Sequence, residues 1–305
     1  MGFTNKGARY ALGVWLRGET IDTNTYLALC TSATAPTVDT NTLGQLTEIA
    51  AGNGYTSGGY QLTHNSTDFD AITENDTDDR ADVQLKDIVW TASGGSIPSS
   101  GDGARYLVWT DNNGTVASRE VYAWWDLSSD RSVSDGQPFT LEDFIYRIPA
   151  GSSGSGWTNK GAYELLNVVM RGGTVDTNMY LALVTSATAP GPDTNTLSDL
   201  TEIAAGNGYT SGGYQLTPNT TDFDVATEDD TNDRGEVEVK DVVWTASGGS
   251  IPSSGDGARY LVLTDDNGTV ANREVYMAWD LTSDRSVSDG ETFTFQDLTV
   301  RMPTA

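Results

Sequence analysis

Acidic side chains form the densest group of residues in this sequence that could do chemistry. Six carboxylates lie between Asp68 and Arg80, and a segment 154 residues later keeps the same character. Carboxylate oxygens are the ligands that Ca²⁺ prefers, although the segment lacks the spacing and the glycine of an EF-hand loop. The alternative is a solvated acidic loop that binds nothing. The calcium candidates are Asp68, Asp70, Asp76, Asp78, Asp222, Asp224 and Asp230, and no other cofactor is expected.

Nucleophilic chemistry has few partners in this chain. His64 is the only histidine and Cys30 the only cysteine, and the equivalent positions of an internal repeat hold Pro218 and Val184. A nucleophile normally needs a base beside it, and thiolate or imidazole metal sites need more ligands than these two residues supply. We therefore expect that the protein is not an enzyme. A hydrolase is the alternative, because a glycosidase pair needs only two carboxylates at a set separation.

Aromatic side chains are the candidates for binding, since they can stack on sugars or anchor an interface. Trp90 and Trp125 recur in both halves of the repeat, within alternating strands, and are expected in the core. Trp109 and Trp124 do not recur, which favours a surface or interface specific to the first half. The interface candidates are Tyr55, Tyr60, Trp109, Trp124, Tyr209 and Tyr214.

The repeat covers nearly the whole chain. Residues 4–149 align with residues 158–303 at a constant offset of 154 and without a gap, and about 107 of the 146 aligned positions are identical. Because two copies share one fold, a residue type that is present in only one copy cannot be needed by both. A repeat of this length predicts two tandem domains. Their expected bounds are 1–149 and 158–305, joined by a flexible Gly/Ser-rich linker at 150–157.

Two stretches recur without any change, 46–63 as 200–217 and 89–108 as 243–262. They contain glycine-rich segments that cannot form regular strands. Such loops are either contact surfaces shared by the copies or structural loops with demanding backbone angles, and the sequence leaves both interpretations open.

The elements that must position these residues are mostly strands. Thr4 is expected to cap a helix over Asn5–Arg17 that Gly18 ends, and Thr158 begins the equivalent helix. Residues 106–110 and 121–127 are typical of a hairpin. Six to eight short strands per copy, separated by Gly, Asp and Asn turns, predict a mainly β protein. We expect two tandem antiparallel β-sandwich or barrel domains, each with one N-terminal helix.

The charge balance excludes some partners. The chain has 43 acidic and 17 basic residues, a net charge of −26. A field of that sign repels phosphate backbones, so nucleic acid is not an expected partner. No apolar run approaches the length of about 20 residues that spans a bilayer, so a membrane is not expected either. The N-terminus lacks the apolar region of a signal peptide, which predicts a protein made in the cytoplasm.

Several motifs, taken in order, resemble those of small virion structural proteins of tailed bacteriophages. They are Tyr26-Leu27-Ala28-Leu29 with Thr31-Ser32-Ala33, Gly54-Tyr55-Thr56-Ser57-Gly58-Gly59, Val89-Trp90-Thr91, Ala104-Arg105-Tyr106, Trp125-Asp126-Leu127, Gly136 and Phe139-Thr140. The resemblance covers nearly all of each copy, and the tandem duplication departs from it. It implies a non-enzymatic structural protein of the phage head or tail.

We therefore expect a capsid decoration (cement) protein that binds and stabilises the head lattice through two equivalent domains. Its partners would be the major capsid protein or other virion proteins, and it would be a homo-oligomer, a trimer being one arrangement that matches sixfold capsomers. Its expected location is the virion, assembled in the host cytoplasm and released by lysis. The alternative is a tail or fibre component with a receptor- or glycan-binding role.

Overall fold

The computed structural model describes residues 2–151 and 153–304 and is mainly β, with 42% of residues in strands and 13% in helices. Copy one contains β1 (Gly2–Phe3), β2 (Asn24–Cys30), β3 (Tyr60–Thr63), β4 (Phe69–Asn75), β5 (Arg80–Leu85), β6 (Ile88–Thr91), β7 (Ala104–Thr110), β8 (Val121–Arg131), β9 (Pro138–Leu141) and β10 (Ile145–Pro149). Copy two contains β11 (Gly156–Trp157), β12 (Met179–Val184), β13 (Tyr214–Leu216), β14 (Phe223–Asp229), β15 (Arg234–Val239), β16 (Val242–Thr245), β17 (Ala258–Thr264), β18 (Val275–Arg285), β19 (Thr292–Phe295) and β20 (Leu298–Pro303). The mainly β prediction is confirmed.

One helix opens each copy, as predicted. Helix α1 spans Asn5–Arg17, and the Thr4 hydroxyl accepts a hydrogen bond of 2.9 Å from the amide of Gly7. Gly18 ends the helix with a φ of 64°, a left-handed conformation that glycine adopts without strain. Helix α2 spans Asn159–Arg171 with equivalent caps. Short 3₁₀ helices occupy η1 (Leu43–Gln45), η2 (Val116–Ser118), η3 (Leu197–Asp199) and η4 (Val270–Asn272).

The strands of each copy form three antiparallel sheets. In copy one the order is β1-β8-β7-β2-β3 in the large sheet, β10-β5-β4 in the second, and β6-β9 in a two-stranded ribbon. Copy two repeats this as β11-β18-β17-β12-β13, β14-β15-β20 and β16-β19. The predicted hairpin is present as β7 paired with β8, with Trp109 opposite Ala123. Residues 83–91 and 139–148 are each divided between the second sheet and the ribbon, because the chain leaves one sheet for the other.

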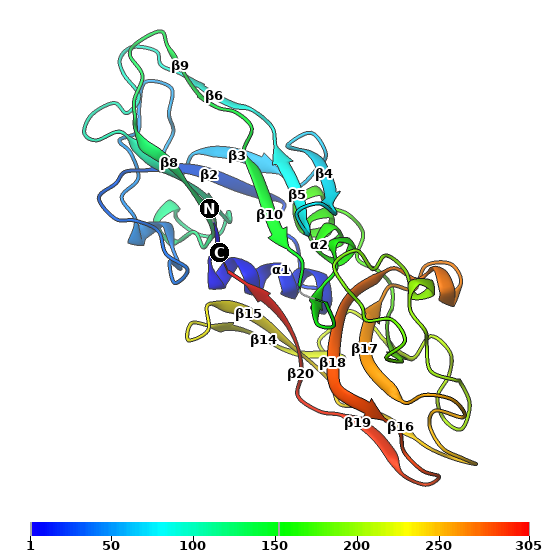
Figure 1. Ribbon diagram of the computed structural model, residues 1–305. Coiled ribbons are helices and arrows are strands. Elements are labelled where there is room, and N and C mark those ends of the chain that lie inside the picture. Colours follow the sequence, from blue (N-terminus) through cyan, green and yellow to red (C-terminus); the bar gives the residue numbers. More distant parts are fainter. Residues whose placement is uncertain (1, 152, 305) are drawn as a thin grey trace.

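Each helix packs between its own large sheet and the second sheet of the other copy. Helix α1 contacts β8 of copy one together with β14, β15 and β20 of copy two, while α2 contacts β18 together with β4, β5 and β10. The two helices also contact one another, and Figure 1 shows both in the middle of an elongated molecule. The copies are therefore interlocked about a pseudo-twofold axis, since each of these helix–sheet contacts has a reciprocal counterpart.

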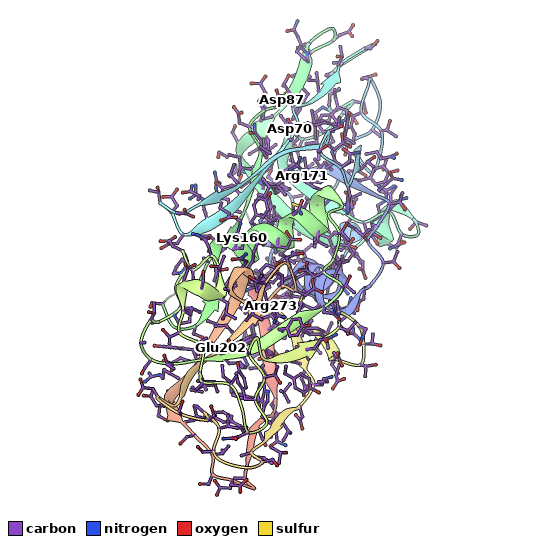
Figure 2. All side chains as sticks on the ribbon, turned by 90° about the vertical axis from the view of Figure 1, so that its right-hand side faces the viewer. Asp70, Asp87, Lys160, Arg171, Glu202 and Arg273 are labelled. Atoms are coloured by element: carbon purple, nitrogen blue, oxygen red, sulfur yellow. The ribbon has the colours of Figure 1, made fainter. Side chains whose placement is uncertain are left out.

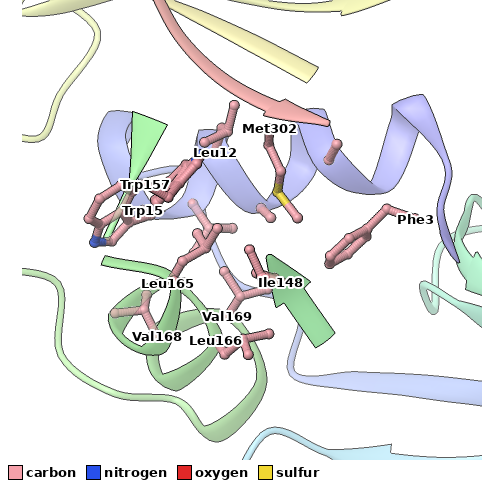
Figure 3. Packing of buried hydrophobic residues seen from close by; sticks show 14 of the residues in the cluster. Phe3, Leu12, Trp15, Ile148, Trp157, Leu165, Leu166, Val168, Val169 and Met302 are labelled. Atoms are coloured by element: carbon pink, nitrogen blue, oxygen red, sulfur yellow. The ribbon is translucent and has the colours of Figure 1, made fainter. Parts of the chain in front are cut away.

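The hydrophobic core joins the copies instead of dividing between them. One cluster of buried side chains includes Leu12, Trp15 and Ile148 of copy one together with Leu165 and Met302 of copy two. These residues meet in Figure 3, where α1 faces α2 across the ends of strands from both copies. The expected pair of tandem sandwiches is thus wrong in arrangement. The structure has four main sheets, two from each copy, packed around the paired helices.

The predicted linker is partly ordered structure. Gly156 and Trp157 form β11, which pairs with β18, and the Trp157 side chain is only 4% exposed. The amide of Gly154 donates to the carbonyl of Pro190 over 2.6 Å. Only residues 150–155 therefore connect the copies, since the repeat begins at β1 and β11 and not after them. Neither described helix is long and apolar enough to cross a membrane.

Candidate functional site: contact surfaces at the two ends

The unchanged loops of the repeat lie at opposite ends of the molecule. We call residues 50–59 and 92–103, with their counterparts 204–213 and 246–257, the end loops. They flank the ribbons β6-β9 and β16-β19, which Figure 1 shows projecting in opposite directions from the central helices. The pseudo-twofold relationship therefore presents two surfaces of the same sequence at the two ends.

Asn53 fixes the end loops of copy one to each other. Its φ is 53°, in the left-handed region that Asn tolerates better than most residues. Its side-chain amide donates to the carbonyl of Ser96 over 2.9 Å, and its own carbonyl accepts from the amide of Ser93 over 2.9 Å. Ser99 adds a hydroxyl hydrogen bond of 2.6 Å to the carbonyl of Ala51. Asn207 makes the equivalent side-chain contact with Ser250, again at 2.9 Å.

Glu48 holds the base of the loops. It accepts hydrogen bonds of 2.7 Å from the Tyr55 hydroxyl, 2.7 Å from Ser57 and 2.5 Å from the amide of Gly58. Burial, with Glu48 nearby, raises the pKa of Tyr55 well above its ordinary value, so the phenol stays a neutral donor. Glu202, labelled in Figure 2, makes the same three contacts in copy two.

The exposed parts of the end loops carry hydroxyl and small side chains. Thr56, Ser93 and Ser100 are exposed, and the outward face of the ribbon adds Val89, which is 49% exposed. Ser100 also lines a hollow of about 310 Å³, together with Thr31, Thr47 and Asp102 among others. Most of these exposed side chains are uncharged, and charged residues are depleted at the centre of protein interfaces.

Both interpretations of the identical loops therefore find support. Demanding backbone geometry accounts for Asn53 and for the glycines, such as Gly54, where an added Cβ would lie 2.2 Å from the carbonyl oxygen of Thr91. It does not account for Thr56 or Ser93, whose side chains are exposed and make no described hydrogen bond. These exposed identities favour a shared contact surface in addition to the structural role.

The tyrosines predicted at an interface belong to the core or its border. Tyr55 and Tyr209 are 2% exposed, which corrects their assignment to a contact surface. Tyr60 and Tyr214 are half-buried. Their rings lie 5.0 and 5.1 Å from the ammonium groups of Lys86 and Lys240, respectively, and their edges meet Trp90 and Trp244.

The two tryptophans specific to copy one differ in burial. Trp109 is 1% exposed and packs 5.5 Å from the ring of Tyr122, so its predicted surface role is wrong. It faces the core because its strand alternates with that side inward. Trp124, on the opposite face of the sheet, is half-buried against a small cluster that contains Cys30. Trp90 and Trp125 are 6% exposed, which confirms the prediction that they lie in the core.

Two of the calcium candidates are already paired with lysine. Asp68 forms a short ion pair with Lys86, and it also accepts a hydrogen bond of 2.7 Å from the amide of Thr63. Asp222 repeats this with Lys240 at 2.5 Å. Both carboxylates are nearly buried, so the partner ammonium and the amide account for their presence without a metal ion.

The other calcium candidates are dispersed. Asp76 accepts a hydrogen bond of 3.3 Å from Asn159, and Asp230 accepts one of 3.0 Å from Asn5, so both tie a helix start to the other copy. Asp78 pairs with Arg80 at 2.9 Å, while the side chains of Asp70 and Asp224 are exposed. Across residues 2–151 and 153–304, no three Asp, Glu, His or Cys side chains gather as a metal site.

Cys30 and His64 lie in different surroundings within copy one. Cys30 is bridged to Glu48 at the base of the end loops, whereas His64 packs against aromatic residues of the core. Cys30 is fully buried, and burial raises the pKa of its thiol, so a reactive thiolate is disfavoured. His64 packs against Phe69 and Trp109, and burial lowers its pKa to about 4. Neither residue is arranged as a nucleophile with a base.

The sequence did not lead us to predict one acidic hollow that the structure contains. Glu164, Asp176 and Asp266 are among the residues that line a space of about 340 Å³ in copy two. Burial raises the pKa of Glu164 to about 7 and that of Asp176 to about 6. The signal was the replacement of Tyr10 by Glu164 between the copies, because Tyr10 stacks on Tyr122 at 4.3 Å in copy one. Copy one has Tyr10 at the position of Glu164, so this carboxyl group cannot explain why the chain is duplicated.

Comparison with known proteins gave no match to a family model, to a curated protein or to a solved structure.

Proposed function

We propose that this chain is a structural virion protein of a tailed phage, most simply a capsid decoration (cement) protein that binds the head lattice through its two end-loop surfaces. One observation carries the proposal. Exposed loop residues are identical at the two ends, whereas buried residues of the shared core, such as Trp109 and Leu263, differ. Loop surfaces normally vary more readily than cores, so an identical pair of surfaces indicates an identical pair of binding partners.

The interlocked core makes the two surfaces a rigid pair. A flexible linker would let each end search a volume, whereas a shared core holds both ends at one separation and orientation. Binding of one end then presents the other to a second lattice site at high effective concentration. Weak contacts at each end add up only where the lattice repeats with the matching geometry, which suits a protein that bridges neighbouring subunits of the major capsid protein.

The pseudo-twofold relationship also bears on where such a protein would sit. A molecule with two like ends fits a local twofold between capsomers, since each end then meets the same kind of subunit. In this arrangement one chain occupies each site. A trimer that binds a sixfold capsomer is the second arrangement. Virion location and the absence of enzymatic activity are parts of the same proposal.

A tail or fibre component that binds glycans is less well supported. Its best platform was Trp109, which is buried. The exposed residues of the end loops are hydroxyl-bearing and aliphatic instead of aromatic, and sugar rings stack mainly on aromatic faces. We therefore favour contact with a protein lattice.

Binding to heads that lack this protein tests the proposal directly. Thr56→Arg alters one end, Thr210→Arg the other, and both residues are exposed. We expect sedimentation with heads to weaken strongly when one end is changed and to disappear when both are. Thr73→Arg with Thr227→Arg is the matched control, because these exposed residues lie on β4 and β14 outside the end loops.

Cryo-electron microscopy of virions that lack the protein gives the second readout. We expect density to be lost from the outer head surface at positions that join neighbouring subunits. Unchanged head density together with a missing tail part would overturn the decoration role, and equal binding by all variants would overturn the role of the end loops.

A further inference from the structure

The reciprocal packing defines an interface whose two sides are copies of each other. Asn5 and Lys6 at the start of α1 reach Asp230 and Glu228, and the equivalent Asn159 and Lys160 reach Asp76 and Glu74. The ion pairs measure 2.7 and 2.6 Å. This is the pattern of an isologous dimer, in which each unit contributes a helix to the sheet of its partner.

The buried centre of this interface is not symmetric. Tyr122 in copy one packs against Trp109, which comes from the neighbouring strand of the same copy, at 5.5 Å between rings. Tyr276, its equivalent in copy two, packs against Trp15, which comes from the helix of the other copy, at 5.4 Å. The positions that would supply a second indole at each site hold Val169 and Leu263. Each tyrosine thus receives one tryptophan, but from opposite sources.

A glycine shows the same complementarity in the backbone. Gly235 on β15 faces α1, and a Cβ added there would lie 2.4 Å from the backbone nitrogen of Arg9. The equivalent residue on β5, facing α2, is Ala81, which is fully buried and carries that Cβ. Helix α1 therefore requires the glycine of copy two, whereas α2 accommodates the alanine of copy one.

We propose that each copy is a binding partner for the unlike copy and discriminates against its own kind. Two units of the first kind would place Trp15 and Trp109 on one tyrosine and bring Ala81 against α1, which overpacks the interface. Two units of the second kind would leave Val169 and Leu263 around that tyrosine, which leaves a void. The pairing is therefore a specific non-covalent interface, and residues 150–155 are not needed to hold it together. This inference is independent of any role in a virion.

Cleavage of the folded chain tests whether the interface holds without the connection. A protease site placed within residues 150–155 of the full chain allows both copies to fold together before they are cut. We expect native mass spectrometry to show, after cleavage, one species with the mass of the intact chain plus the one water that hydrolysis adds. The halves should separate only in denaturant. Two free halves under native conditions would overturn the proposal.

A double-mutant cycle in the uncut chain tests the complementarity. Leu263→Trp adds an indole beside the one from Trp15, and Trp15→Val removes the latter, so each change alone is expected to lower the melting temperature by at least about 4 °C. Together they rebuild the arrangement of copy one, in which the strand supplies Trp and the helix supplies Val. We expect the double variant to melt above the Leu263→Trp variant. A melting temperature of the double variant that is lowered by the sum of the two single losses or by more would overturn the complementarity. If the Leu263→Trp chain does not fold, a double variant that also fails to fold would overturn it.

Discussion

Lys6 at the start of α1 lies 2.7 Å from the carboxylate of Glu228 in the other copy. Its counterpart Lys160, labelled in Figure 2, lies 2.6 Å from Glu74. The remaining lysines, Lys86 and Lys240, pair with Asp68 and Asp222. In a chain with 43 acidic residues, all four lysines therefore occupy equivalent structural ion pairs, and two of them bind one copy to the other.

Removal of one cross-copy carboxylate should weaken the interlocked fold. Among the residues that the structure describes, Glu228→Gln leaves the partly buried Lys6 with only Glu120, at 3.5 Å, as its ionic partner. We expect the free energy of unfolding in urea to fall by about 1 kcal/mol, and the loss to shrink in 1 M salt because screening weakens such pairs. Asp87→Asn, a change at an exposed carboxylate of copy one, serves as the control and should have no measurable effect.

The two tryptophans specific to copy one should differ sharply in their contribution to stability. Trp109→Ala opens a large cavity in the shared core and should cost about 3–5 kcal/mol in urea unfolding. Trp124→Ala introduces the residue that copy two has at that position, Ala278, and removes a half-buried ring. Its cost should be about 1 kcal/mol. Equal costs for the two variants would contradict the packing described for Trp109.

Local signals in the sequence predicted local structure well. Helix α1 begins after Thr4 and ends at Gly18 as expected, because capping depends on residues within one turn. The hairpin of β7 and β8 followed from alternation on both sides of a polar connection. Strand alternation also placed Trp90 in the core. The surface prediction for Trp109 was wrong because it relied on the absence of this tryptophan from copy two.

The contacts between the two copies could not be predicted from the sequence. A helix that packs on its own copy and one that packs on the other copy have the same apolar stripe, so the repeat predicted separate domains. The clues to interlocking were the copy-specific residues of the core, Trp15, Gly235 and Leu263, but their meaning depends on which residues face one another. Likewise, Asp76 and Asp230 resembled metal ligands until their contacts with the opposite helix start were known.

The acidic hollow of copy two should make stability depend on pH near neutrality. Burial raises the pKa of Glu164 to about 7, so between about pH 4.5 and 7 the folded protein binds more protons than the unfolded chain. Stability therefore falls as pH rises through this window. Glu164→Gln removes that titration and should raise the melting temperature at pH 8 more than at pH 5. Glu164→Tyr, which restores the residue of copy one, should behave in the same way, whereas an equal effect of Glu164→Gln at the two pH values would contradict the prediction.

His64 should produce the opposite dependence in acid. Burial against Phe69 and Trp109 lowers its pKa to about 4, below the value of about 6.5 in an unfolded chain. The unfolded chain therefore binds the extra proton between about pH 6.5 and 4, and stability falls as pH falls through this range.

His64→Pro removes the titrating group and introduces the residue that copy two tolerates at the same place, Pro218. Carboxyl groups also titrate in this pH range, so the informative quantity is the difference in unfolding free energy between the variant and the natural chain at each pH. We expect urea unfolding to show the variant gaining roughly 2 kcal/mol on the natural chain between pH 7.5 and 4.5. A constant difference between the two proteins across that range would show that His64 does not titrate on unfolding.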